Sequence, residues 1–187
     1  MILFVNACAR PESRTYALAQ KALSYLPGEA TQLNLYEEDL KPLTYEDLTK
    51  RDEGIGRGDY SGEIFRYARE FREADEIVIA APYWDLAFPS VLKCYVETLC
   101  VNGLTFFYNE QGIPESLCRA KKLIYVTTAG GPIPEENFGY DYIKAVCTGF
   151  FGVGECVCFK AEGLDIFGAD VSGILKAAEE KIAETLG

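Results

Sequence analysis

The hydrophobic pattern alternates between strand-like runs and stretches with helical spacing from one end of the chain to the other. An apolar run at 2–7 precedes a stretch at 13–26 whose apolar side chains share one helical face and which stops at Pro27-Gly28. Further strand-like runs lie at 30–36, 76–84, 121–131 and 155–163, and further helical patterns lie at 62–75, 88–100, 136–150 and 170–186. Such alternation predicts an α/β fold with a doubly wound, five-stranded parallel sheet and helices on both faces.

Two segments interrupt this alternation. Residues 37–60 are charged, rich in glycine and weakly patterned, which favours a surface excursion. Residues 104–114 have the pattern of a hairpin or a loop excursion. A length of 187 residues suits a single domain with a sizeable core, so we expect one domain over residues 1–187.

The composition excludes several classes of protein. No apolar run approaches the roughly 20 residues of a membrane helix, and the apolar start is too short for a secretory signal. A net charge of −11 argues against nucleic acid as a partner. Seven scattered cysteines without a CxxC pair are typical of reduced thiols, which predicts a cytoplasmic protein. The absence of histidine removes Ser-His-Asp triads and Cys/His metal sites, and we expect no metal.

Ligands of doubly wound sheets bind beyond the carboxyl ends of the strands, which directs attention to three loops. The first loop leads into a helix, where free N–H groups and the helix dipole favour an anion. Ser13 and Thr15 add hydroxyl donors there, and Arg10 and Arg14 add positive charge. An ordinary helix cap with solvated arginines remains the alternative, because neither a GxGxxG nor a Walker A motif is present.

The second and third loops suit a flat, conjugated ligand. The second contains an aromatic pair, which would form a wall, and its residues are Pro82, Tyr83, Trp84, Asp85 and Leu86. The third would offer backbone N–H groups to carbonyl oxygens, and its residues are Thr127, Thr128, Ala129, Gly130 and Gly131. Taken singly, packing aromatics and a simple turn would explain them. A phosphate site, an aromatic wall and a donor turn at one sheet edge together indicate a pocket for flavin mononucleotide (FMN).

The chain also resembles the flavodoxin-fold FMN-dependent NAD(P)H:quinone reductases and NADH-azoreductases over nearly its whole length. In that family the second loop reads approximately Pro-Met-Tyr-Asn-Phe, followed by a Leu-Lys-x-Tyr/Trp helix and a Gly-x-Thr-Phe segment. The sequences 82–86, 92–95 and 103–106 occupy these places without a gap. The family's Thr-Ser-x-Gly-Gly turn is similar to 127–131, and its Ser-x-Ser pair is similar to Ser13-Arg14-Thr15.

The resemblance implies a flavodoxin-like sheet of order 2-1-3-4-5 and FMN as cofactor, with NADH or NADPH as electron donor and a quinone or azo compound as acceptor. It also implies a homodimer with the active site at the interface, for which Phe107, Tyr108 and Phe151 are candidate covering residues, with core packing as the alternative for Phe151. Two positions depart from the family pattern. Ala7-Cys8 replaces an early serine, and Asp85 stands where asparagine is frequent.

The expected reaction is hydride transfer through flavin N5, two electrons at a time, with no side chain assigned as catalytic because the cofactor carries the chemistry. The alternative from another class is an electron-carrier flavodoxin, which the acidic composition also fits. A relative that has lost its flavin and only binds a partner is a third possibility. The hairpin segment and the 92–106 block favour the reductase.

Overall fold

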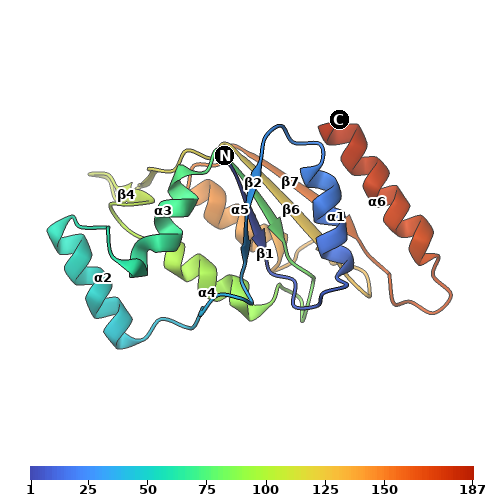
Figure 1. The fold of residues 1–187 in the computed structure, drawn as a ribbon, viewed down its shortest axis with the longest axis horizontal. Coiled ribbons are helices and arrows are strands. Elements are labelled where there is room, and N and C mark those ends of the chain that lie inside the picture. The colour runs from blue at the N-terminus through green and yellow to red at the C-terminus, as the bar shows by residue number, and fades with distance from the viewer.

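A computed structural model describes residues 1–187 and contains a five-stranded parallel sheet (Figure 1). Its order is β2-β1-β3-β6-β7, which confirms the predicted order 2-1-3-4-5 with β6 and β7 as the fourth and fifth strands. The strands are β1 (Ile2–Asn6), β2 (Ala30–Asn34), β3 (Glu76–Ala80), β6 (Lys122–Thr128) and β7 (Glu155–Ala161). No helix is both long enough and apolar enough to cross a membrane.

Helices cover both faces of the sheet (Figure 1). Alternate residues of β1 show why: Ile2 and Phe4 are buried on one side, and Leu3 and Val5 are buried on the other. One face packs against α1 (Arg14–Leu23) and α6 (Val171–Leu186). The opposite face packs against α3 (Arg66–Glu73), α4 (Ser90–Leu99) and α5 (Tyr140–Gly149).

The segment at 37–60 lies at the surface, as predicted, but it contains a sixth helix that the sequence pattern did not predict, α2 (Tyr45–Arg57). Thr44 and Asp47 form a reciprocal capping box at its start, and Gly58 ends it in the left-handed conformation with φ 64°. Gly54 is its one buried residue, so α2 has no apolar stripe for a hydrophobic period to detect. The signal in the sequence was the capping motif.

The segment at 104–114 is a hairpin, as predicted. Strands β4 (Phe106–Tyr108) and β5 (Pro114–Ser116) pair antiparallel and form a separate two-stranded sheet. A short 3-10 helix, η1 (Glu63–Phe65), precedes α3 and occupies the start of the helix predicted at 62–75. Several predicted elements are shorter in the structure, because their outer residues belong to caps and loops.

Phe151 does not fit its predicted role in covering the flavin of a partner. Its side chain is only 1% exposed, and its ring centroid lies 4.8 Å from that of Phe71 in the core between the sheet and α3 to α5. A residue enclosed by its own subunit cannot reach another one. Phe107 and Tyr108, on β4, are exposed and remain available for such a contact.

Candidate functional site

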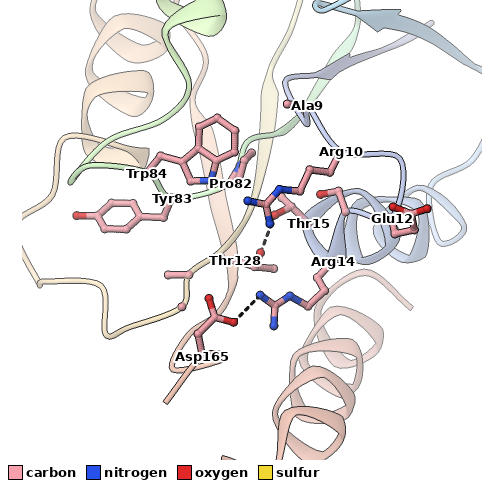
Figure 2. Close-up of a pocket in the computed structure, with 13 residues that line it drawn as sticks. Ala9, Arg10, Glu12, Arg14, Thr15, Pro82, Tyr83, Trp84, Thr128 and Asp165 are labelled. Carbon is pink, nitrogen blue, oxygen red and sulfur yellow. Dashed lines mark hydrogen bonds and ion pairs between the residues drawn. The ribbon is translucent and has the colours of Figure 1, made fainter. Parts of the chain in front are cut away.

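The three predicted loops begin at the same edge of the sheet. Parallel pairing continues past the strand ends, since the N–H group of Ala7 donates to the carbonyl of Ala80 (2.8 Å) and that of Tyr83 to the carbonyl of Thr128 (3.0 Å). Between them lies a cavity of about 230 Å³ (Figure 2). It is lined by Ala9, Arg10, Glu12, Ser13, Arg14, Thr15, Pro82, Tyr83, Trp84, Thr128, Ala129, Gly130 and Asp165.

The first loop presents the amino terminus of α1 to this cavity. Ser13 caps the helix, because its hydroxyl accepts a hydrogen bond from the N–H group of Tyr16 (3.3 Å). The N–H groups of Arg14 and Thr15 have no acceptor within the chain. With Arg10 exposed at the cavity wall, free donors and positive charge converge where an anion can bind.

Arg14 also belongs to the cavity, but its guanidinium already has partners. Its Nη2 lies 2.9 Å from Oδ1 of Asp165, and its Nη1 donates to the carbonyl of Leu164 at 3.4 Å. Figure 2 shows this ion pair across the base of the cavity. An anion in the cavity would therefore compete with Asp165 for the guanidinium.

The prediction from sequence missed Asp165. It lies on the loop after β7, where its N–H group donates to the carbonyl of Gly130 (2.9 Å). A Cβ atom on Gly130 would lie 2.4 Å from Oδ2 of Asp165, so a side chain at position 130 would displace this carboxylate. The order 2-1-3-4-5 places the fifth strand beside the fourth, and this adjacency was the available signal for its loop.

A hydroxyl pair joins the first loop to the third. The Oγ1 atoms of Thr15 and Thr128 lie 2.7 Å apart, and both side chains are buried. The bond fixes the first turn of α1 against the end of β6, which aligns the anion-binding helix terminus with the glycine turn. Figure 2 shows the two side chains meeting behind Arg10.

Ala7-Cys8 stands where the reductase family has an early serine, so the first loop lacks one hydroxyl donor. Ala7 is fully buried, and the thiol of Cys8 approaches the carbonyl of Ala80 at 3.8 Å. Burial raises the pKa of this thiol to about 11, so it stays neutral at physiological pH. The chain therefore has no hydroxyl at the position of the early serine of the reductase family. The helix terminus, Ser13 and the arginines remain as hydrogen-bond donors to an anion.

The second loop contains a tight turn with unusual backbone angles. The backbones of Trp84 and Ala87 exchange two hydrogen bonds (3.0 and 2.8 Å), and the two residues between them have φ values of 51° (Asp85) and 67° (Leu86). Positive φ at both central positions defines a type I′ turn, which asparagine and glycine normally occupy. The N–H groups of Asp85 and Leu86 have no acceptor within the chain, so the strained turn leaves two backbone donors free.

Only one of the two aromatics forms the predicted wall. Trp84 stands beside the cavity and is partly exposed. The ring of Tyr83 points away from Arg10 and Arg14 in Figure 2, and it lies close to Gly139, where an added Cβ would be 3.4 Å from the ring. Tyr83 is therefore among the residues that line this cavity, but its phenol ring points away from it.

The third loop supplies further free donors, because the N–H groups of Gly130 and Gly131 have no acceptor within the chain. Ten of the fourteen predicted cofactor-binding residues line the cavity, and those that do not are Asp85, Leu86, Thr127 and Gly131. The cavity thus combines an anion site, a flat aromatic side and unpaired backbone donors, a set that fits the phosphate, ring and carbonyl oxygens of FMN.

Comparisons with known proteins agree with this geometry. A sequence model of the family described as "Flavodoxin-like fold" matches residues 1–186. The FMN-dependent NADH:quinone oxidoreductase 2 of Clostridium acetobutylicum is 36% identical over 195 residues, covering 98% of this chain and 96% of that protein. The FMN-dependent NADH:quinone oxidoreductase of Clostridium beijerinckii is 34% identical over 193 residues, with the same coverage. The crystal structure of an azoreductase from Bacillus anthracis superimposes with a TM-score of 0.83 at 28% identity, covering 99% of this chain and 97% of that one.

We expect Leu86→Gly to raise the free energy of unfolding by about 0.5–1 kcal/mol. Glycine removes the strain of φ 67°, and the exposed leucine side chain contributes little burial. Urea denaturation measures the change. The matched control is Ala87→Gly, at a neighbouring position without positive φ, which should lower stability by about 0.5–1 kcal/mol. Equal effects of the two substitutions would show that the turn is unstrained.

Proposed function

The chain belongs to the flavodoxin-like fold family, and we propose that residues 1–187 form one FMN-binding domain that transfers electrons from NADH to quinones or azo compounds. The observation that carries this proposal is the likeness, over 98% of the chain, to relatives named as FMN-dependent NADH:quinone oxidoreductases. The donor set of the cavity and of the loops beside it supports the proposal independently, because it offers groups that would match the phosphate, the ring and the carbonyl oxygens of FMN.

Different residues of the cavity would bind different parts of the cofactor. The free N–H groups at the start of α1, the hydroxyl of Ser13 and the guanidinium of Arg10 would hold the phosphate. Trp84 would flank the flat ring, and the backbone donors of Gly130 and of the turn at Asp85 would face its oxygen and nitrogen atoms. The buried Thr15–Thr128 bond holds these groups in fixed relation before the cofactor binds.

When bound, FMN supplies hydride acceptance and two-electron transfer, and the protein supplies position and electrostatics. Without histidine, the chain has no imidazole acid or base, and no side chain of the cavity is assigned a catalytic role. The carboxylate of Asp85 lies on the turn beside the cavity, and Coulomb repulsion from it would oppose negative charge on the ring.

An electron-carrier flavodoxin is the competing function, and the net charge of −11 is its main support. The relatives favour the reductase, since those named above are quinone oxidoreductases and an azoreductase. NADPH as an alternative donor and the cytoplasmic location stay predictions. The basis of the cytoplasmic prediction is the sequence, with seven scattered cysteines and no CxxC pair.

Anaerobic titration of the FMN-loaded protein separates the reductase from the carrier. We expect NADH to bleach the flavin absorbance and a quinone to restore it, because a reductase accepts and delivers electrons in pairs. Titration with dithionite should bleach the flavin in nearly one step, with little long-wavelength absorbance at half reduction. A strong long-wavelength band together with no response to NADH would instead identify a one-electron carrier.

Substitutions of the ion pair test the orientation of the cofactor. Arg14→Ala should weaken FMN binding by about 1.5–3 kcal/mol if the guanidinium turns to the phosphate, and should affect riboflavin much less. Asp165→Asn should strengthen FMN binding, because it removes the competing carboxylate 2.9 Å from Arg14. Equilibrium fluorescence titration of the wild type and both variants with both flavins measures the six dissociation constants. Equal losses for FMN and riboflavin in Arg14→Ala would place the phosphate elsewhere.

We further propose a homodimer that covers the open side of the site. Exposed apolar side chains surround the cavity loops and the hairpin, and a monomer would leave them in water. They are Trp84, Leu86, Phe107, Tyr108, Ile113, Phe138, Ile166 and Phe167. Sedimentation should give twice the chain mass of 20.8 kDa at micromolar concentration, and Phe167→Asp should shift the protein toward the monomer. A monomeric wild type with full FMN binding and turnover would refute the dimer.

A further inference from the structure

A second pocket lies behind Tyr83, on the α5 side of the sheet, and the proposed function makes no use of it. Its volume is about 270 Å³. Tyr125 and Thr127 form its floor, two residues apart on β6, and Tyr140 comes from α5. Residues 133–137 lie over it, held where the N–H group of Ile133 donates to Oε2 of Glu162 (2.8 Å).

Three hydroxyl groups in this pocket are buried and have no hydrogen-bond partner within the chain: those of Tyr83, Tyr125 and Thr127. The side chains of Tyr125 and Thr127 are only 1% and 3% exposed. A buried hydroxyl without a partner costs about 1–3 kcal/mol, so three around one space imply something that they bind. The neighbouring Tyr140 shows the contrast, because its hydroxyl donates to the carbonyl of Cys156 at 2.9 Å.

The lining restricts the chemistry of the occupant. Tyrosine rings form flat walls, with Tyr125 and Tyr140 at a centroid distance of 5.7 Å. Burial raises the pKa of both the Tyr83 and the Tyr125 hydroxyls, so they remain protonated and can both donate and accept. Glu135 and Asp141 add negative charge, whereas the ammonium of Lys160 lies 3.2 Å from Glu162.

A volume of about 270 Å³ accommodates an occupant of one or two fused rings. The negative charge disfavours an anion, and three amphoteric hydroxyls favour a partner that both donates and accepts hydrogen bonds.

We propose that the pocket formed by Tyr83, Tyr125, Thr127 and Tyr140 binds a flat, uncharged hydroxy-aromatic molecule of one or two rings, and that the three unpaired hydroxyls recognise its oxygens. The site is separate from the flavin cavity, and Tyr83 stands between them as the one residue that lines both. The proposal does not depend on the proposed function, because its test measures binding of the molecule to the pocket and not turnover.

Calorimetric titration of the full chain with 2,6-dihydroxynaphthalene, with and without saturating FMN, tests the proposal. We expect binding in both conditions without release of FMN. Naphthalene, which lacks oxygens, and naphthalene-2,6-dicarboxylate, which is a dianion, should each bind at least several-fold more weakly. Displacement of FMN by the diol would place it in the flavin cavity and overturn the proposal.

Single-atom substitutions give the residue-level test. Tyr125→Phe and Thr127→Val remove one hydroxyl each and should weaken binding of the diol by about two- to tenfold. The matched control is Tyr95→Phe, because the Tyr95 hydroxyl is also buried and unpaired but lies in the core away from this pocket. Thermal denaturation checks that each variant folds. Undetectable binding, or equal binding by the wild type and both pocket variants, would leave water as the partner of these hydroxyls and overturn the proposal.

Discussion

The hydrogen bond between Thr15 and Thr128 is the constraint on which the candidate site depends. It joins the first turn of α1 to the last residue of β6, two segments 113 positions apart in the chain. Both side chains are buried, so the loss of either hydroxyl would leave the other without a partner in the interior. The helix terminus that suits an anion and the turn that suits ring oxygens are thereby fixed relative to each other by the fold itself.

Around this bond, the sheet supplies the rest of the geometry. Pairing that continues beyond the strands brings four loops to one edge, and each loop contributes a different kind of group. The loop after β7 contributes a carboxylate that pairs with Arg14, and Glu12 also lines the cavity, so Arg10 and the helix terminus are the positive groups left to hold an anion. In a chain with net charge −11, such local compensation determines how strongly an anion is held.

Much of this arrangement could be predicted from the sequence. The order of the sheet, the hairpin and ten of the residues that line the cavity follow from apolar periodicity, loop chemistry and the resemblance to the reductases. Periodicity could not identify α2, because a helix with only Gly54 buried carries no apolar stripe. The sequence pattern did not identify Asp165, because its loop has no motif and only the spatial order of the strands brings it to Arg14. The direction of the Tyr83 ring and the burial of Phe151 depend on packing around them, which no local pattern encodes.

The position of α2 at the periphery has a consequence for local unfolding. The helix is joined to the body by the Arg51 guanidinium, which donates to the carbonyls of Glu97 (3.1 Å) and Cys100 (2.6 Å) at the end of α4, and by the packing of Gly54 on Phe65. Because α2 buries so little apolar surface, it can open without disturbing the sheet. Amide hydrogens in α2 would then exchange with solvent by a low-energy opening of this helix alone, while those of β1, β3 and β6 would exchange only when the whole domain unfolds.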